Sequence, residues 1–346
     1  MGLAVSQLAL ASAPVSPTST RAEDALQRPA VSVKHPGQAV LLGAAVQGAR
    51  WVAVGERGLI VVSEDGGRQW TQVDSPVSVT LTAVRFANPQ FGVAVGHGGV
   101  VLVTNNGGRE WKARLDGRAL GNLLQAQAQS RGDADAMAMA QRLASEGPDK
   151  PWLDVSVAGA GQITVVGAYG LALHSDNGGR SWRSFAGPLD NPRGMHLYAI
   201  RQVGQRILIA GEQGLVLLSE DGGRSFSRLQ THYKGSFFAA ELLPDGGLLV
   251  AGLRGQVLRS GDGGQSWVAL ASPATGAITG IALQANGVPV LASQSGQLLG
   301  LQGSALVPWG PQDLPPLNGV VAVDAKRVLA LSVRGPIPIE LPGGAP

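Results

Sequence analysis

A repeated glycine-rich segment constrains the fold of this chain more than any other feature. Five copies of the pattern Ser/Thr-x-Asp/Asn-Gly-Gly-x-x-Trp/Phe begin at residues 63, 104, 175, 219 and 260. An apolar run, a GxxG turn and a second apolar run precede each copy, as in residues 51–62. Apolar runs that flank a short glycine-containing turn are typical of paired β-strands. We therefore expect a series of small antiparallel sheets.

The spacing of the units predicts how these sheets assemble. The second glycine of the GxxG element steps along the chain by 41, 71, 44, 41, 41 and 39 residues, at Gly58, Gly99, Gly170, Gly214, Gly255, Gly296 and Gly335. The last two copies are weaker. A repeat of about 40–45 residues that holds four short strands is typical of a propeller blade. The sequence thus predicts an all-β fold, a single seven-bladed β-propeller over residues 27–346.

The single long step indicates an insertion after the second blade, at residues 117–150. Its apolar residues recur at spacings of three and four, which predicts two short helices broken around residues 130–133; they are Leu120, Leu123, Leu124, Met137, Ala140, Leu143 and Ala144. Two interpretations stay open. The insertion is either a packed surface hairpin or a lid or docking element beside the central channel.

The two ends of the chain raise separate expectations. The last unit ends near Leu341 without a fourth strand, and residues 28–35 are predicted to supply it and so close the ring. Residues 1–26 resemble a flexible leader. Its apolar residues 3–11 run into Ala11, Ser12 and Ala13, like a secretory cleavage site, although no positive charge precedes them. We expect an exported, periplasmic protein, with a cytoplasmic protein that has a disordered tail as the alternative.

Composition and motifs exclude several classes of site. The chain has no Cys, so it has no disulfide, thiolate zinc site or cysteine nucleophile. Its 27 basic and 24 acidic residues are spread along the sequence, so no nucleic acid partner is expected. No apolar run approaches the roughly 18–20 residues of a transmembrane helix. No nucleotide motif is present and the histidines lack ligand spacing, so neither a cofactor nor a metal is predicted.

The glycine-rich box has a local structural chemistry. Its Asp or Asn side chain can accept backbone N–H groups of its own turn, and its paired glycines allow positive φ. Its aromatic residue buries a large ring where neighbouring sheets meet. We therefore interpret the boxes as structural rather than catalytic, through Asp65, Trp70, Asn106, Trp111, Asn177, Trp182, Asp221, Phe226, Asp262 and Trp267.

These boxes resemble the Asp-box, or BNR, repeat. The combination of GxxG, an apolar strand and SxDGGxxW around a seven-fold ring resembles the photosystem II stability/assembly factor family from about residue 38 to 341. The resemblance implies an exported, membrane-associated scaffold that binds proteins under assembly. We expect a non-catalytic protein whose partner is a membrane complex or exporter. The family has non-photosynthetic relatives, and the Ala/Arg/Gly-rich composition, the degenerate last blades and the insertion favour one of these. We expect a monomer.

One rim of the propeller is predicted to bind the partner. The GxxG turns and the links between blades should share this rim, and the boxes should lie on the other. The turns present Arg57, His97, Tyr169, Glu212, Arg254, Ser295 and Arg334. Arginine forks pair well with carboxylates, so these residues suggest a site for an anionic group or a peptide. The links 193–198 and 232–234 add aromatic and basic groups. Solvated turn residues are the alternative interpretation.

A glycoside hydrolase is the rival function, because sialidases and some glucanases use BNR propellers. A carboxylate-pair glycosidase needs two carboxyl groups about 5–9.5 Å apart. Glu56 and Glu212, the obvious carboxylates of the rim, belong to blades 1 and 4 and should face each other across the ring. A sialidase would also need a nucleophilic tyrosine with an arginine triad, and no Arg-Ile-Pro segment is present. We therefore predict that the protein is not an enzyme.

Overall fold

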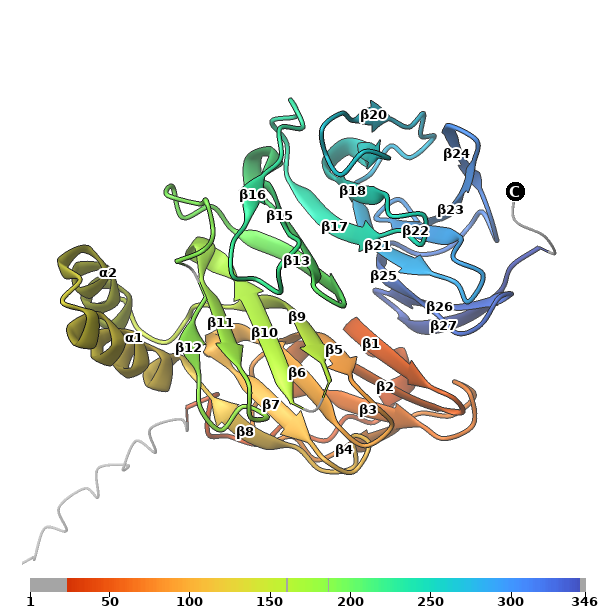
Figure 1. The fold of residues 1–346 in the computed structure, drawn as a ribbon. Helices are drawn as coiled ribbons and strands as arrows, with labels where there is room; N and C mark the ends of the chain where they lie inside the picture. Colours follow the sequence, from red (N-terminus) through yellow and green to blue (C-terminus); the bar gives the residue numbers. More distant parts are fainter. Residues whose placement is uncertain (1–23, 160, 186, 343–346) are drawn as a thin grey trace, which may run out of the picture.

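The computed structural model describes residues 24–342 except 160 and 186. In this part of the chain, seven antiparallel sheets follow one another around a ring (Figure 1), and each pairs its strands in chain order. The first strands of successive sheets contact each other, and the first strand of the first sheet contacts that of the last. The prediction of a seven-bladed β-propeller is confirmed.

Each blade begins with its inner strand and proceeds outward. Blades 1 and 2 comprise β1 (Leu41–Gln47), β2 (Arg50–Gly55), β3 (Ile60–Ser63), β4 (Thr71–Val73), β5 (Leu81–Phe86), β6 (Gly92–Gly96), β7 (Val101–Thr104) and β8 (Lys112–Leu115). Blades 3 and 4 comprise β9 (Trp152–Ala158), β10 (Gln162–Gly167), β11 (Ala172–Ser175), β12 (Arg183–Ser184), β13 (Leu197–Val203), β14 (Arg206–Gly211), β15 (Val216–Ser219) and β16 (Ser227–Arg228).

The remaining blades follow the same order. Blades 5 and 6 comprise β17 (Phe237–Leu242), β18 (Leu248–Gly252), β19 (Val257–Ser260), β20 (Val268–Ala269), β21 (Ile278–Leu283), β22 (Pro289–Ser293), β23 (Gln297–Gln302) and β24 (Ala305–Pro308). Blade 7 has three strands, β25 (Leu317–Ala322), β26 (Arg327–Ser332) and β27 (Gly335–Glu340). The insertion forms the two predicted helices, α1 (Gly117–Arg131) and α2 (Ala134–Ser145).

Crowding around the propeller axis selects small residues at the third position of the inner strands. A Cβ on Gly43 would lie 2.8 Å from the Cα of Ala83 in the next blade. A Cβ on Gly280 would likewise lie 3.0 Å from the Cα of Gly319. Six blades have Gly or Ala at this position, namely Gly43, Ala83, Ala199, Ala239, Gly280 and Gly319. Blade 3 differs, because it has Asp154 there.

Each glycine-rich box is held by its own side chains. In blade 1 the Ser63 hydroxyl accepts the Gly67 N–H at 2.8 Å, and the Asp65 carboxylate accepts the Gln69 N–H at 3.0 Å. The Gly66 N–H donates to the carbonyl of Ala49, in the turn between the first two strands. Blades 2–5 repeat the bond from the second glycine to the hydroxyl. The box therefore fixes the turn between the third and fourth strands.

The aromatic residue of each box packs at the interface with the preceding blade. Trp111 belongs to a core cluster with residues of blade 1, and Trp182 to one with residues of blade 2. Trp70 packs on the cluster that joins blades 7 and 1, with its ring centroid 6.4 Å from that of Trp51. Burial of these large rings stabilises the contact between blades.

The acid stability of the propeller should depend on three box carboxylates. Hydrogen bonds from Gln69 and Ser63 lower the pKa of Asp65, those from Ser225 lower the pKa of Asp221, and those from Ser266 lower the pKa of Asp262 to about 2. Because these folded-state pKa values lie below the usual value of about 3.9, the stabilisation is complete above about pH 4 and is lost toward pH 2.

Replacing all three carboxylates by amides should therefore reduce the loss of stability that the protein suffers as the pH falls from 5 to 2. Asn106 and Asn177 already occupy this position in blades 2 and 3, so the variant Asp65→Asn/Asp221→Asn/Asp262→Asn should fold. Calorimetric melting at pH 5, 4, 3 and 2 should show a smaller loss of melting temperature for the variant than for the wild type. Equal losses would show that the box carboxylates do not contribute to the acid limb.

The predicted closure of blade 7 by residues 28–35 is wrong. The Ala30 N–H donates to the Ser75 carbonyl at 3.1 Å, and the Val33 N–H donates to the Gln72 side chain at 2.8 Å. This segment therefore follows the outer edge of blade 1, where β4 has only three residues and leaves backbone groups available. Blades 7 and 1 are joined instead by a shared apolar cluster and by the Asn318 side-chain amide, which donates to the Leu41 carbonyl at 3.1 Å.

The predicted leader boundary also shifts. Leu26 is buried against blades 1 and 2, and the Ser78 N–H donates to the Ala25 carbonyl at 2.8 Å. Residues 24–26 are thus part of the propeller, and the signal-like residues 3–13 lie outside the described residues. No helix within the described ranges is long and apolar enough to span a membrane.

Candidate functional site

Backbone hydrogen bonds show which turns lie together on each rim of the propeller. The GxxG turn of blade 4 touches the link that enters the same blade, because the Glu212 N–H donates to the His196 carbonyl at 2.9 Å. The equivalent bond joins His97 to Thr80 in blade 2 and Ala168 to Pro151 in blade 3. At the opposite ends of the strands, the boxes of blades 1–4 each donate a backbone hydrogen bond to the turn between the first and second strands, as from Gly66 to Ala49 and from Gly222 to Gln205. We call the surface of GxxG turns and blade links the link rim, and the other surface the box rim.

The GxxG turns expose a side chain from a strained backbone. Arg57, Tyr169 and Arg254 all lie in the left-handed region, with φ of 53°, 58° and 58°. Tyr169 is 51% exposed, although a tyrosine is a large partly apolar residue. Left-handed backbone at a non-glycine residue costs about 1–2 kcal/mol and is concentrated at functional sites. These turns therefore expose their side chains to solvent at some cost in stability.

The predicted rim residues do not all come together. Arg57, His97, Arg254 and Arg334 lie on blades 1, 2, 5 and 7, and all are exposed. In the described part of the chain, no ion pair or side-chain hydrogen bond joins one of them to another. Ser295, in blade 6, bonds locally to Ser293 and Gln297. The predicted arginine site is thus distributed around the link rim.

Tyr169 lies at the outer end of a continuous line of aromatic rings. Its ring centroid lies 5.2 Å from that of His196, and its N–H donates to His196 Nδ1 at 2.8 Å. His196 is 6.1 Å from Tyr198, and Tyr198 is 5.1 Å from Phe238, both as edge-to-face pairs. We call Lys150, Tyr169, His196, Tyr198 and Phe238 the aromatic track. It crosses the link rim from blade 3 to blade 5.

A buried lysine anchors the outer end of the aromatic track. The Lys150 ammonium lies 5.6 Å from the centre of the Tyr169 ring, within cation–π distance. Burial lowers the pKa of Lys150, but its hydrogen bonds to Asp149 and Glu146 raise it more, so the net direction is upward. Lys150 therefore stays charged and contacts the face of the Tyr169 ring.

The inner end of the aromatic track reaches the central channel. Tyr198 and Phe238 are the second residues of β13 and β17, and both line the channel. Burial raises the pKa of Tyr198, and the nearby charge of Glu212 raises it further. The links at 193–198 were predicted from sequence to contribute here, whereas Lys150 and Phe238 were missed. The sequence gives little reason to single out these two residues, because lysine and phenylalanine are common near the ends of strands.

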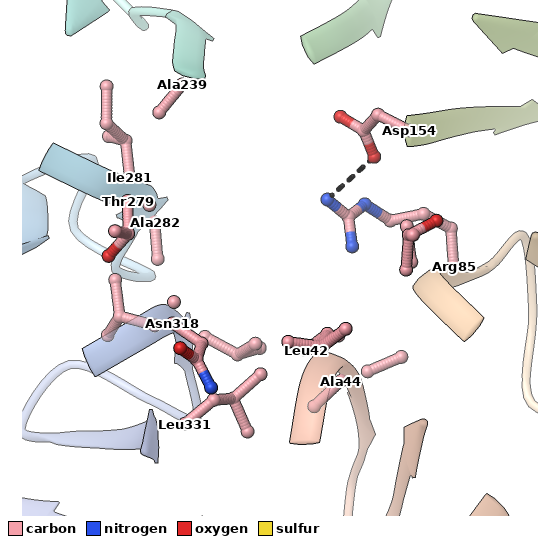
Figure 2. Close-up of a pocket in the computed structure, with 18 of the residues that line it drawn as sticks. Leu42, Ala44, Arg85, Asp154, Ala239, Thr279, Ile281, Ala282, Asn318 and Leu331 are labelled. Carbon is pink, nitrogen blue, oxygen red and sulfur yellow. Dashed lines mark hydrogen bonds and ion pairs between the residues drawn. The ribbon is translucent and has the colours of Figure 1, made fainter. Parts of the chain in front are cut away.

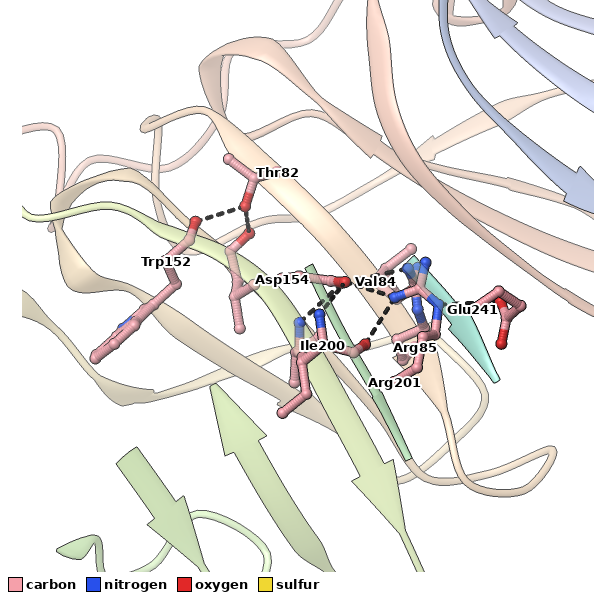
Figure 3. A network of polar contacts seen from close by, with 10 residues as sticks. Thr82, Val84, Arg85, Trp152, Asp154, Ile200, Arg201 and Glu241 are labelled. Carbon is pink, nitrogen blue, oxygen red and sulfur yellow. Dashed lines mark hydrogen bonds and ion pairs between the residues drawn. The ribbon is translucent and has the colours of Figure 1, made fainter. Parts of the chain in front are cut away.

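A chain of charged side chains, centred on the buried Asp154, crosses the inner strands of blades 2–5 (Figure 3). Asp154 accepts hydrogen bonds from Arg85 at 3.2 Å, from Arg201 at 2.6 Å and from the Ile200 N–H at 3.1 Å. Arg201 also pairs with Glu241 at 3.3 Å. Burial raises the pKa of Asp154, but the two arginines lower it more, so the carboxylate is held ionised.

This network was not predicted, although the sequence carries a signal for it. Arg85, Arg201 and Glu241 are each the fifth residue of an inner strand, where blades 1 and 6 have alanine and blade 7 has valine. Three charges at one register of otherwise apolar strands indicate ion pairs inside the ring, because an unpaired buried charge is strongly disfavoured.

The helical insertion packs on the outer edge of blade 3 (Figure 1). Asp116 caps α1 by accepting the Arg118 and Ala119 N–H groups. The Gln127 side chain donates to the Trp182 carbonyl at 2.9 Å and accepts the Ser184 N–H at 2.8 Å. Gln127 thus satisfies the backbone of the edge strand β12, which otherwise offers a template for aggregation. This position fits the packed-hairpin interpretation rather than a lid over the channel.

The carboxyl groups relevant to hydrolysis occupy separate environments. Glu56 and Glu212 lie in the GxxG turns of blades 1 and 4, and Glu212 accepts the His196 N–H at 3.2 Å. In the channel, Asp154 and Glu241 share the guanidinium of Arg201. An acid and a base for glycoside hydrolysis need free access to the scissile bond and a water. The described residues also hold no group of three metal-ligating side chains.

Residues 141–313, half of the chain, match the family model described as photosynthesis system II assembly factor YCF48. The solved structure of YCF48 bound to D1 peptide is similar, with 15% identity and a TM-score of 0.64, covering 91% of this chain and 99% of that one. YCF48 from Cyanidioschyzon merolae has 15% identity and a TM-score of 0.66, covering 89% and 98%.

An enzyme shares the same fold. The Niastella koreensis GH74 enzyme has 18% identity and a TM-score of 0.61, and the match covers 89% of this chain and 44% of that one. At these identities the structural likenesses show the fold alone. No curated protein sequence matches this chain.

Proposed function

We propose, since this chain belongs to the family of the photosynthesis system II assembly factor YCF48, that it is a non-catalytic scaffold that binds a protein partner. A structural neighbour, YCF48, is known in a complex with a D1 peptide. The family membership and this neighbour support protein binding as the general activity. We propose further that the partner here is a segment of a membrane complex or exporter under assembly, in a bacterium without photosystem II.

The aromatic track is the observation that carries the choice of surface. Its rings are held by the Lys150 contact and by the hydrogen bond from the Tyr169 N–H to His196. The side chain of Tyr169, at its outer end, is accessible to a partner. Aromatic side chains dominate the energetics of protein interfaces because they bury a large area with little loss of rotamer freedom. The track fits an extended peptide segment that runs from blade 3 to the channel mouth.

The distributed arginines have a different role in this proposal. Arg57, Arg254 and Arg334 lie on the link rim in blades 1, 5 and 7, and in the described part of the chain no ion pair or side-chain hydrogen bond joins them. Charges at the edge of an interface change the association rate and its salt dependence more than the affinity. We therefore propose that they steer an acidic partner toward the rim, while the aromatic track holds it.

Tyr169→Ala is expected to reduce recovery of the partner at least tenfold, because truncating an aromatic hot spot costs about 2 kcal/mol or more. Recovery is measured by affinity purification from the cells that make this protein, with quantitative mass spectrometry. The matched control is Val203→Ala, which removes a 60% exposed apolar side chain from the box rim. Equal recovery with Tyr169→Ala and wild type, or an equal loss with Val203→Ala, would contradict the proposed surface.

Export to the periplasm, as a monomer, completes the proposal. Its support is the apolar run at residues 3–11 with the Ala11, Ser12 and Ala13 cleavage-like segment. A fusion of residues 1–30 to alkaline phosphatase, which is active only outside the cytoplasm, should be active. An inactive fusion that is made in full would place the protein in the cytoplasm instead.

A glycoside hydrolase remains the alternative function, and the GH74 enzyme that shares the fold is the observation in its favour. The Arg201 bridge between Asp154 and Glu241 argues against it. Purified protein is expected to leave a panel of sialosides and β-glucans uncleaved. Release of reducing sugar that persists after Asp154→Asn would point to other carboxylates, and any turnover would overturn the non-catalytic proposal.

A further inference from the structure

The box rim carries a groove of about 330 Å³ between blades 2 and 3. Its lining comes from the boxes of both blades, from β8, and from the turns that precede β6 and β10. Pockets that bind small molecules have volumes of about 300–1,000 Å³, so the groove lies at the small end of that range. It is on the opposite rim from the aromatic track, and the inference below therefore does not rest on the proposed function.

The groove differs from the central channel in how its charges are used. The channel encloses about 540 Å³, and Figure 2 shows Arg85 bonded there to Asp154. Arg201 pairs with the same carboxylate. The groove is also lined by two arginines, Arg114 and Arg180, but no acidic residue of the described chain lines it. Of these two cavities, the groove is the one that presents positive charge without a carboxylate beside it.

One departure from the blade repeat places Arg114 in the groove. Three residues after the box aromatic, blades 1, 3, 4 and 5 have an apolar residue, whereas blade 2 has Arg114. In blades 3 and 4 this residue, Phe185 or Leu229, fills the space beside the next box, where a Cβ on the second glycine would overlap with it. In blade 2 the corresponding Cβ, on Gly179, would lie 3.3 and 3.4 Å from the Cβ and Cγ of Arg114. Only the stem of Arg114 therefore covers the next box, and its side chain is exposed.

A second departure removes the bridge that joins blades 1 and 2. Five residues before the glycine that ends the second strand, blade 1 has Arg50, which donates to the Gly107 carbonyl of the blade 2 box at 3.3 Å and pairs with Glu64 at 2.6 Å. At the same position blade 2 has Phe91, which packs on the core of blades 2 and 3 and has no side-chain donor. Asn105 replaces the carboxylate of Glu64. The groove therefore lacks both partners of the ion pair that blade 1 has.

The polar groups of the groove are consequently available to a ligand. Within the described residues, neither Arg114 nor Arg180 has an ion pair or a side-chain hydrogen bond, and the same holds for the side chain of Asn105. Asn88 accepts the Gln90 N–H at 2.9 Å through its carbonyl oxygen, which leaves its amide N–H groups to donate. Two guanidinium groups and two side-chain amides therefore offer donors in one groove.

These donors favour a ligand with more than one negative charge. Arginine forks match the geometry of phosphate and carboxylate oxygens. A phosphomonoester carries about −1.5 to −2 charges at pH 7 and three strong acceptor oxygens, whereas a monocarboxylate offers one charge to two arginines. The acid of the blade 3 box, Asp176, is already paired with His174 at 2.7 Å. The two amides suit hydroxyl groups, so a phosphorylated sugar satisfies both kinds of donor.

We propose that the groove between blades 2 and 3 binds a sugar phosphate, with its phosphate on Arg114 and Arg180 and its hydroxyl groups on the side-chain amides of Asn88 and Asn105. The phosphate supplies the negative charge that Glu64 supplies between blades 1 and 2. Because the groove and the aromatic track lie on opposite rims, the ligand and a protein partner can bind at the same time.

Isothermal titration calorimetry with glucose 6-phosphate tests the proposal on the whole protein. One molecule is expected to bind per chain. Inorganic phosphate should bind at least tenfold more weakly because it lacks the sugar, and glucuronate should do so because a single carboxylate replaces the phosphate. The absence of saturable binding of glucose 6-phosphate, or equal binding of either of the other two compounds, would overturn the proposal.

Two variants that should fold locate the site. Arg114→Leu introduces the residue that blade 4 has at this position, Leu229, and Arg180→Gln introduces the residue that blade 5 has, Gln265. Each should weaken the binding of glucose 6-phosphate at least tenfold. The matched control is Arg224→Gln, which removes an exposed arginine from the same position of the blade 4 box, outside the groove, and should leave binding unchanged.

Asn105→Glu tests the charge of the groove without removing an arginine. It introduces the carboxylate that blade 1 has as Glu64, so it should pair with Arg114 or Arg180 and weaken the binding of glucose 6-phosphate at least tenfold. Unchanged binding in Asn105→Glu, unchanged binding in both arginine variants, or an equal loss in Arg224→Gln would each overturn the assignment of the groove.

Discussion

Asp154→Ala is expected to lower the free energy of unfolding by about 3–5 kcal/mol, because it removes the buried carboxylate that the partly exposed Arg85 and Arg201 share. The Ile200 and Val155 N–H groups lose an acceptor as well. Alanine is the residue that three other blades use at the same position, so the inner-strand backbone accommodates it. The loss therefore measures the charge network and not a steric conflict. Urea unfolding followed by circular dichroism gives the value.

Glu241→Gln is the matched control, and it should cost less than about 1 kcal/mol. Burial raises the pKa of Glu241 in spite of Arg201, so the ionised form of this carboxyl is disfavoured in the folded protein. A glutamine keeps an acceptor for Arg201 and removes the buried charge. Losses of equal size in the two variants, or a loss below about 1 kcal/mol in Asp154→Ala, would contradict the assignment of Asp154 as the centre of the network.

Gly214→Ala is the second change with a large expected effect, a loss of about 2–5 kcal/mol. Gly214 has φ of 77°, and a Cβ there would lie 1.9 Å from the Tyr233 carbonyl oxygen. The left-handed backbone costs about 1–2 kcal/mol for alanine, and the displacement of packed backbone adds about 1–3 kcal/mol. The GxxG turn would have to move away from the link that enters blade 5.

Gly48→Ala separates these two contributions. Gly48 also has positive φ, 61°, but a Cβ there meets nothing within 4 Å. Its loss should be only the backbone cost of about 1–2 kcal/mol. Urea unfolding of both variants checks the difference, and equal losses would show that the close approach of turn and link does not constrain Gly214.

The number of blades could be predicted because the repeated sequence pattern lies in the turns and not in the strands. A close approach to the neighbouring link requires glycine at Gly58 and Gly214, and the boxes require paired glycines with positive φ at residues such as Gly66 and Gly67. These backbone demands hold in blade after blade, whatever the strand residues are. The helices of the insertion were predictable for a similar reason, since their apolar residues follow the helical period.

The closure of the ring was not predictable, because strand patterns do not identify a partner edge. Residues 28–35 suit an extended segment, and both blade 7 and blade 1 have an outer edge to offer. The side-chain amide of Gln72 hydrogen-bonds to the backbone of both Val31 and Val33, and these bonds hold the segment at the edge of blade 1. A single glutamine on a three-residue strand gives no recognisable signal in the sequence.

The candidate site was predictable only in part. The GxxG turns were correctly expected to share a rim with the blade links, and Tyr169 was among the predicted residues. Its contacts with Lys150 and His196 join segments from different blades, and only the folded ring defines those distances. The three arginines belonged to the same prediction, and the ring places them on separate blades.

Photo-crosslinking from position 169 tests directly whether a protein partner occupies the aromatic track. Tyr169→p-benzoylphenylalanine places a photoreactive aromatic group at the exposed end of the track, and the same group in place of Val203 serves as the control on the box rim. After irradiation of intact cells, we predict one dominant protein adduct from position 169 and none of that protein from position 203. The same adduct from both positions, or none from position 169, would show that the partner does not occupy the aromatic track.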